Sequence, residues 1–268
     1  MTPAATDAPA WQPLTPRGVA AFARAPLWRL LLMQFIFAAA VAATAGWFLH
    51  ADWFPTIRDA VRRLPEQGEI RSGRLIWTNA SPQLLAEGHF LALSVDLHHE
   101  GATRSPAHVQ VEFGRDDAWI FSLPGYRQFN YPDDRTLAFN RVDLEPWWGA
   151  WSPAVWWMAF GAVLLGLMAS WAALAMVYLF PVRLAGFFAN RDLSLAGSFK
   201  LAGAALMPGA LFMIGAIIFY GLGALDLVQL AAAIGAHLMI GWVYLFLGVL
   251  FAPRLPLASG TRRNPFAR

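Results

Sequence analysis

The sequence contains no cysteine and little charge. Without cysteine, neither a disulfide framework nor a thiolate metal site can form. Charged residues make up only 14% of the 268-residue chain, hydrophobic residues make up 57%, and the mean hydropathy is +0.45. This balance lies outside the usual range of soluble globular domains and within that of multi-span membrane proteins. The formal net charge of +3 is too small to indicate nucleic-acid binding, so we expect no nucleic-acid partner.

Charge is scarcest in four long apolar stretches, which we predict to be transmembrane helices. The second is the clearest, because residues 154–180 include no charged side chain and would extend about 40 Å as a helix, more than a hydrocarbon core of roughly 30 Å. Tryptophans cluster before it, and tryptophan favours the headgroup level because its ring is apolar while its N–H needs a partner. The predicted helices span residues 27–49, 151–180, 201–223 and 227–251, and the predicted interface anchors are Trp147, Trp148, Trp151, Trp156 and Trp157.

Basic residues set the predicted topology. They flank the apolar stretches in the tail 1–26, the loop 181–200 and the tail 252–268, so the positive-inside rule places these segments in the cytoplasm. The chain is then a multi-pass protein of a bacterial inner membrane. The first tail is rich in Ala, Pro and Thr, and we expect it to be mostly disordered. The alternative is that residues 27–49 form a cleaved secretory signal ending near Ala43-Thr44-Ala45, but the long preceding segment and the spanning length favour a retained helix.

Residues 50–150 carry 14 acidic and 10 basic side chains (51–150) and fall on the opposite side of the membrane. Their pattern predicts an inserted extracytoplasmic α+β domain, mainly antiparallel β, between the first and second helices. Residues 54–64 have the period of a short amphipathic helix. Apolar and polar residues then alternate, as in strands with one buried and one solvated face. The predicted strands are 91–97, 109–113 and 119–123, with weaker ones at 70–77 and 136–142 and a turn at 114–117.

The sequence also lacks the common catalytic motifs. It has no phosphate-binding glycine loop with a lysine, no His-Glu-x-x-His and no Gly-x-Ser-x-Gly. These absences favour a non-enzymatic protein, and we expect no cofactor and no metal. We predict a scaffold, accessory or binding role through the outer domain. The expected partners are the lipid bilayer and either another protein or a second copy of the chain.

Three residues of the helical part are candidates for function. His237 is an ionisable group in the middle of the fourth apolar stretch, where such groups often belong to a proton or ion path. Pro208 and Gly209 interrupt the third stretch, where they would bend a helix and let a neighbour approach. Together they support an alternative function as a transporter, channel component or sensor. Apart from Arg29 at one edge, however, no charged residue lies in the four stretches to complete a relay. We therefore favour a neutral His237 bonded to a carbonyl or to a tyrosine.

Two catalytic or metal-binding alternatives are weaker. Ser170 and His237 could form the nucleophile and base of an intramembrane protease, but counting from the helix ends places them at different depths. In the outer domain, His98, His99, Glu100 and His108 could meet around zinc. Because adjacent residues of a strand point to opposite faces, only one of the two neighbouring histidines could take part. A solvated loop explains this group better.

The order of the parts resembles a bacterial family of integral membrane proteins of unknown function, related in appearance to Yip-type membrane domains. The resemblance implies a first span, a small outer domain and a helical bundle with an early proline in a later span, and it implies no catalytic residues. The residues that carry it are Leu64-Pro65-Glu66-Gln67-Gly68-Glu69-Ile70-Arg71-Ser72-Gly73-Arg74-Leu75, Leu93-Ser94-Val95-Asp96, Ser198-Phe199-Lys200-Leu201-Ala202 and Met207-Pro208-Gly209.

Overall fold

The computed structural model describes residues 12–255, so the predicted tails lie partly outside the described residues. The chain divides into two compact units, one mainly helical and one that contains the sheets. The helical unit comprises Met1–Val41, Val163–Gly215 and Ala232–Arg268, and the sheet unit comprises Ala42–Ala162 and Ala216–Ala231. Four helical segments are long and apolar enough to cross a membrane, as a membrane protein requires: Leu27–Arg62, Arg141–Phe188, Leu195–Gly221 and Leu227–Phe251.

The helical unit begins with a helix that the sequence did not predict. Within the tail expected to be disordered, α1 (Pro16–Phe22) starts where the Thr15 hydroxyl accepts a hydrogen bond from the Gly18 N–H at 3.1 Å. Such a cap satisfies an N–H that has no partner within the helix. Val19 and Phe22 of α1 are fully buried. The tail was therefore wrongly predicted in this part, because burial of these apolar side chains stabilises a short helix that has little signal of its own.

The third apolar stretch contains two helices that meet at Leu206. They are α5 (Leu195–Ala205) and α6 (Met207–Gly221), and α7 (Leu227–Phe251) follows them. The break precedes Pro208, which has no N–H to continue the hydrogen-bond ladder of α5. The small residues of α5 from Gly197 onwards are buried, and the side chain of Gln34 in α2 (Leu27–Phe48) donates to the Gly203 carbonyl at 3.2 Å. A polar side chain in an apolar helix is thus accommodated by a backbone acceptor.

The helix α4 (Arg141–Phe188) is longer at both ends than the predicted span 151–180. It begins after Asn140, whose side-chain oxygen accepts a hydrogen bond from the Asp143 N–H at 2.9 Å. It continues through Pro181, so residues 181–188 of the predicted loop are helical. The expectation that Pro181 ends the helix was wrong, because proline removes only one backbone bond and long apolar helices tolerate it.

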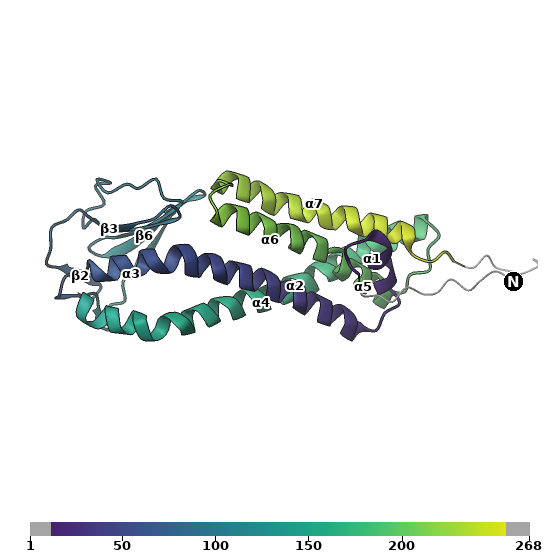
Figure 1. Ribbon diagram of the computed structural model, residues 1–268, viewed down its shortest axis with the longest axis horizontal. Helices are drawn as coiled ribbons and strands as arrows, with labels where there is room; N and C mark the ends of the chain where they lie inside the picture. Colours follow the sequence, from purple (N-terminus) through teal and green to yellow (C-terminus); the bar gives the residue numbers. More distant parts are fainter. Residues whose placement is uncertain (1–11, 256–268) are drawn as a thin grey trace, which may run out of the picture. The chain divides into compact units, whose positions relative to one another are not determined.

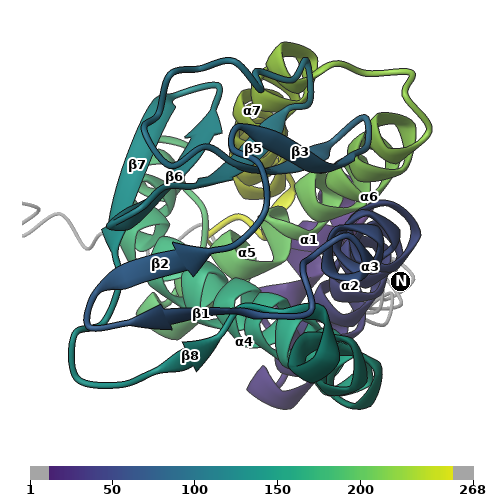
Figure 2. The same ribbon diagram turned by 90° about the vertical axis from the view of Figure 1, so that its left-hand side faces the viewer.

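In the sheet unit, the π-helical turn η1 (Leu49–Trp53) leads into α3 (Phe54–Arg62), which matches the predicted amphipathic helix. Two sheets follow (Figures 1 and 2). The three-stranded sheet has the order β2-β1-β8 and contains β1 (Gly68–Arg71), β2 (Arg74–Trp77) and β8 (Leu137–Ala138). The five-stranded sheet has the order β3-β4-β5-β6-β7 and contains β3 (Gln83–Glu87), β4 (Leu91–Val95), β5 (Val109–Phe113), β6 (Asp117–Ser122) and β7 (Gly125–Asn130).

The strands differ from the sequence prediction in four ways, the first being that β3 and β7 were not predicted. Residues 70–77 form a hairpin, because Ser72 and Gly73 have positive φ angles of 49° and 71° and reverse the chain. The weak strand at 136–142 is reduced to β8, since α4 begins at Arg141. The sheet is mixed, because β4 and β5 are parallel and are joined by residues 96–108. The remaining pairings are antiparallel.

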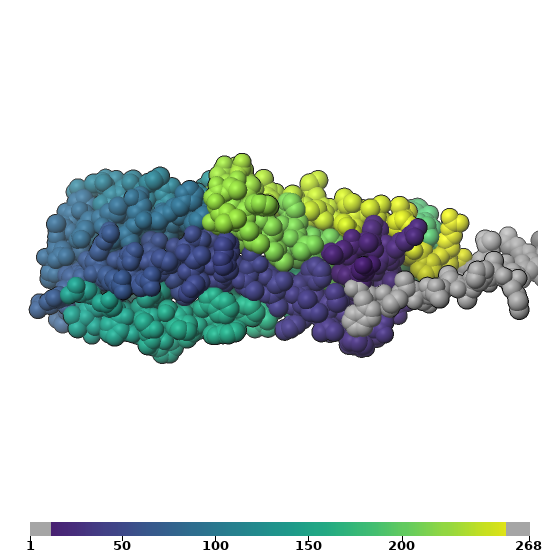
Figure 3. Space-filling model, viewed as in Figure 1, coloured from purple at the N-terminus to yellow at the C-terminus, as the bar shows by residue number. Residues whose placement is uncertain are grey.

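The apolar core of the sheet unit lies between the strands and α3. Ala60 and Leu64 pack there with residues of both sheets, including Ile70, Leu85 and Val95. Figure 3 shows the atoms of α3, in dark blue, directly against those of the strands in lighter blue. The strands β3, β4 and β5 therefore turn apolar residues to this core, and the polar residues Ser94, Gln110 and Glu112 lie on the other face of the sheet.

Candidate functional site

The three candidates in the helices meet at one close contact. A Cβ atom added to Gly209 would lie 2.6 Å from the His237 carbonyl oxygen, so the backbones of α6 and α7 touch at this point. The His237 ring bonds through Nδ1 to the Ile234 carbonyl of its own helix. Pro208 lies in the first turn of α6, where the missing N–H costs little. The arrangement favours helix packing over a relay, and Ser170 likewise donates to a carbonyl of its own helix, that of Leu167.

The predicted anchor tryptophans lie in the first part of α4 and have different surroundings. Trp156 donates its indole N–H to the Gly46 carbonyl at 2.8 Å, and Trp148 packs edge-on against Phe54. These two side chains attach α4 to the segment that precedes the sheets. The other three are about half exposed or more: Trp147, Trp151 and Trp157.

The strongest polar cluster of the described residues lies on the polar face of the five-stranded sheet. His99 bonds through Nδ1 to a carboxylate oxygen of Glu112 at 2.6 Å and through Nε2 to a carboxylate oxygen of Asp117 at 2.7 Å. Glu112 is fully buried, while the side chains of His99 and Asp117 are 16% and 14% exposed. The second carboxylate oxygen of Glu112 has no partner in the described part of the chain. We call these three residues the His99 bridge.

The connection between the two parallel strands places His99 in this cluster. Asp96, at the end of β4, accepts hydrogen bonds from the N–H groups of His98 and Gly101 at 3.3 Å and 3.0 Å. This turn leaves His99 with a φ of 54°, which directs its ring back over the sheet. Gly114 allows the approach, because an added Cβ would lie 2.1 Å from His99 Nε2. The bridge therefore links residues 96–108 to β5 and β6.

The electrostatics of the bridge favour a charged imidazole. Burial alone would lower the pKa of His99, but its hydrogen bonds to Glu112 and Asp117 outweigh that effect and raise the pKa above its usual 6.5. Burial would raise the pKa of Asp117, but the hydrogen bond from His99 and the charge of its ring outweigh burial and lower the pKa below 3.8. Since a charged imidazole donates from both nitrogens, neither nitrogen is free to accept a proton. The bridge is therefore suited to holding the fold together and not to general-base catalysis.

The residues considered for zinc are separated by the fold. His99 belongs to the bridge, whereas the His108 ring bonds to the Tyr220 hydroxyl at 2.6 Å and lies beside His89. Burial, together with repulsion from His89, lowers the pKa of His108 below 6.5 despite the opposing charge of Asp226. His98 and Glu100 are exposed. The four residues therefore do not converge.

Aromatic rings continue from the bridge across β6 to the edge of the sheet. The Trp119 ring stacks on His99 with centroids 4.3 Å apart and on Tyr126 with centroids 4.9 Å apart. Next to them, the Arg104 guanidinium lies 3.8 Å from the centroid of the Phe121 ring. Tyr126 is 64% exposed. This row leads to β7, the last strand of the sheet.

The two edges of the five-stranded sheet are unlike. The edge strand β3 packs against α3 and has a register shift between Leu84 and Ala86. The other edge strand, β7, is exposed along all six residues, and its register with β6 is unbroken. It lies at the outer side of the sheet (Figure 2). An edge strand presents unpaired N–H and C=O groups, so β7 is a template for a further strand.

The comparisons with known proteins found no matching family model, no matching curated protein and no matching solved structure. The resemblance to the Yip-like family therefore stays a prediction.

Sequence reasoning missed Glu112, Asp117 and β7 as parts of a site. Glu112 alternates with Val111 and Phe113, and we interpreted it as a residue of the solvated face. Its burial depends on residues 96–108 folding over that face. The only available signal was a histidine near two acidic residues in neighbouring predicted strands.

Proposed function

We propose that this protein is a non-enzymatic integral protein of the bacterial inner membrane that binds an extended segment of a partner protein on the outer side of the membrane. The partner would add a strand to the open edge at β7. The observation that carries this proposal is the exposure of all six residues of β7 at the end of a regular sheet. The apolar helices would hold the sheet domain at the membrane surface, with both chain ends in the cytoplasm.

The edge strand β7 lacks the features that usually shield the edge of a sheet from pairing with another chain. Natural sheets usually shield an edge with bulges, prolines, several charges or a covering helix. β3 has a register shift and a neighbouring helix, whereas β7 has neither proline nor register shift and has one charged residue, Arg127. A strand of this kind promotes aggregation unless something pairs with it. Strand addition to an exposed edge is a common way of recognising extended peptides.

The side chains of β7 indicate the chemistry of the partner. Tyr126 and Phe129 are 64% and 48% exposed and, by strand alternation, lie on opposite faces. Arg127 lies between them. The best complement is an extended segment with apolar residues on both faces and an acidic residue beside Arg127. Main-chain hydrogen bonds would supply affinity, and these side chains would supply specificity.

The register identifies which backbone groups to remove. Ser122 pairs with Gly125 across a two-residue loop, so these two residues exchange both backbone hydrogen bonds. Along β7, residues that bond to β6 through the backbone then alternate with residues whose backbone N–H and C=O groups face the open edge. Gln128 then directs its N–H towards the open edge. Proline at such a position removes one donor for the partner while keeping the ladder to β6. Gln128→Ala is the matched control, because it also loses the side-chain hydrogen bond from Gln128 to Asp117.

The test uses the full-length protein in its native membranes with a photo-crosslinking amino acid at Tyr126 and, as a position control, at Asp134. We expect one partner polypeptide to be crosslinked from Tyr126 and not from Asp134. Gln128→Pro should reduce the yield about tenfold, as expected for the loss of about one edge hydrogen bond, and Gln128→Ala should leave it unchanged. No crosslink, or a yield insensitive to Gln128→Pro, would reject the proposal. A crosslink between two copies of this chain would reject a foreign partner and would show that β7 pairs with a second copy instead.

A further inference from the structure

The helical unit contains a cavity of about 510 Å³ at the end of α4, which is separate from the sheet edge. Two arginines, Arg183 and Arg191, line it together with Asn190, Phe187, Phe188 and Leu193. Cationic groups therefore share one cavity with exposed aromatic rings. This combination matches an amphipathic ligand with an anionic head.

The end of α4 explains how the arginines come together. Asn190 has a φ of 52°, and the Arg191 N–H donates to the Gly186 carbonyl at 2.8 Å, which closes the helix with a left-handed turn. The chain after the turn is held by the segment that follows α7, since the Asp192 N–H donates to the Pro253 carbonyl at 2.8 Å. Arg183 precedes the turn by about two helical turns. Both walls of the cavity are therefore fixed by backbone hydrogen bonds.

The two guanidinium groups retain donors for a ligand. Arg183 donates through Nη1 to the Leu193 carbonyl at 2.8 Å, and Arg191 donates through Nη1 to the Ala252 carbonyl at 2.7 Å. Arg191 Nε is buried and has no hydrogen-bond partner in the part of the chain that the structure describes. A guanidinium group has five N–H donors, so both arginines keep further N–H groups that can bind anionic oxygens in the cavity.

The surrounding charges favour an anion. The carboxylate at the cavity is that of Asp192, which pairs with Arg24 at 3.5 Å. The backbones of Arg191 and Arg254 pair in an antiparallel way, which brings a further basic residue next to the segment that follows α4. The positive side chains therefore outnumber the negative one.

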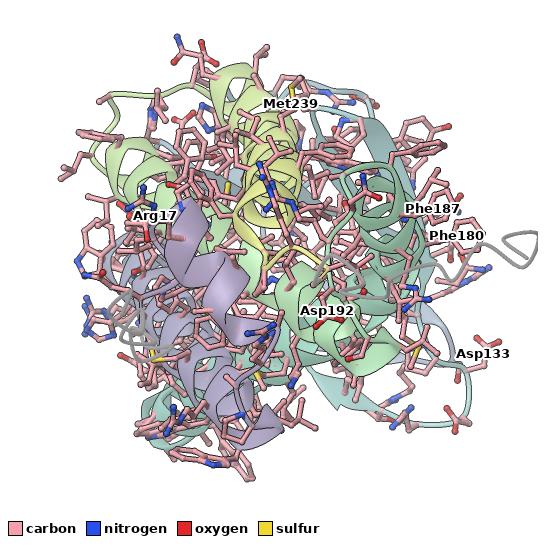
Figure 4. The ribbon with its side chains drawn as sticks, turned by 90° about the vertical axis from the view of Figure 1, so that its right-hand side faces the viewer. Arg17, Asp133, Phe180, Phe187, Asp192 and Met239 are labelled. Carbon is pink, nitrogen blue, oxygen red and sulfur yellow. The ribbon has the colours of Figure 1, made fainter. Side chains whose placement is uncertain are left out.

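An apolar stripe continues from the cavity along α4. Phe180, Leu184 and Phe187 follow one another at spacings of four and three residues, so they share one face of the helix. They are 77%, 54% and 76% exposed. Phe180 and Phe187 extend outwards from the helix (Figure 4). Such a stripe suits hydrocarbon chains, which free phosphate lacks.

We propose that this cavity binds the phosphate headgroup of an anionic membrane lipid, whose acyl chains lie along Phe180, Leu184 and Phe187. Arg183 and Arg191 bind the phosphate oxygens, and the lipid connects the end of α4 with the segment after α7. The proposal is independent of the docking function at β7.

The test compares the purified full-length protein in nanodiscs of phosphatidylcholine alone and of phosphatidylcholine with phosphatidylglycerol. Native mass spectrometry measures the lipid that stays bound, and thermal unfolding measures its stabilisation of the fold. We expect phosphatidylglycerol to be retained in preference to phosphatidylcholine and to raise the unfolding temperature. Arg183→Gln should reduce this preference about tenfold, the effect of losing about one charge-assisted hydrogen bond.

Two further variants keep the test decisive. Arg17→Gln is the matched control, because Arg17 is a basic residue of the same unit that lies over the Phe251 ring and does not line the cavity. It should retain the full preference. Arg191→Lys keeps the positive charge, and it should weaken the preference because an ammonium group cannot form the two parallel hydrogen bonds of a guanidinium to phosphate. An equal preference in wild type and Arg183→Gln would overturn the proposal, as would equal stabilisation by inorganic phosphate, which would assign the cavity to a free anion.

Discussion

At the scale of single residues, His99 combines three features that rarely occur together on a surface loop. Its backbone is left-handed, both ring nitrogens bond to carboxylates, and one of those carboxylates belongs to the fully buried Glu112. A buried carboxylate is strongly disfavoured unless a charge or several donors compensate it. The hydrogen bond from His99 therefore compensates for the burial of the Glu112 carboxyl group inside the sheet domain.

Replacing His99 tests this compensation. His99→Ala leaves the buried Glu112 carboxyl group without its partner and should destabilise the sheet domain by about 3 to 5 kcal/mol. Hydrogen exchange of the β5 and β6 amides in the full-length protein measures the effect. Adding Glu112→Gln to His99→Ala should recover part of the loss, because a buried amide is less costly than a buried carboxyl group that has lost its partner. The exposed neighbour supplies a control, since His98→Ala should change exchange little. Equal exchange in His99→Ala and His98→Ala would contradict the account.

The bridge also predicts a pH dependence. Because the pKa of His99 is raised in the folded state, its stabilisation is complete below about 6.5 and is lost as the pH rises through the folded pKa. Because the pKa of Asp117 is lowered, its stabilisation is complete above about 3.8 and is lost as the pH falls through the folded pKa. The difference in unfolding temperature between wild type and His99→Ala should therefore be largest between these two values and should shrink towards alkaline pH. A difference that grows towards alkaline pH would show that His99 is not the cation.

At the scale of elements, the contact between α6 and α7 depends on one glycine. Gly209→Ala would place a Cβ 2.6 Å from the His237 carbonyl, so the helices must separate, at a cost of about 1 to 3 kcal/mol. The control lies in the same helix. Gly215→Ala meets nothing within 4 Å and should be neutral or slightly stabilising, because alanine is the better helix former. Thermal unfolding in detergent distinguishes the two, and equal effects would show that the close contact is absent.

The elements also show what could be predicted from sequence. The amphipathic helix at α3 and the strands β4 and β5 have clear periodicity because each contributes residues to the core, and β6 alternates because Trp119 and Phe121 lie on the face of the His99 bridge. β7 has no such alternation, since both of its faces are exposed, and β3 is irregular because of its register shift. The parallel pairing of β4 with β5 depends on the path of residues 96–108, which no local pattern encodes. The His99 bridge depends on the same path, so it could not be predicted either.

At the scale of the whole molecule, we propose that the four apolar helices cross the membrane and that the sheet domain lies on the opposite side from the chain ends. The helices meet the length and hydropathy that a bilayer requires. By the positive-inside rule we expect the basic residues near Arg183 and Arg191 on the cytoplasmic side, and residues 51–150, with their acidic balance, on the other side. The proposed docking edge and the proposed lipid site would then face different compartments.

Cysteine labelling tests this arrangement most directly, because the natural chain has no cysteine. Glu100 and Asp192 are exposed, so single substitutions Glu100→Cys and Asp192→Cys should leave the fold intact. A membrane-impermeant maleimide should label Glu100→Cys in cells whose inner membrane is intact, and it should label Asp192→Cys only after that membrane is opened. Labelling of both positions from the outside, or of Asp192→Cys alone, would contradict the account and would remove the basis for an outward-facing β7.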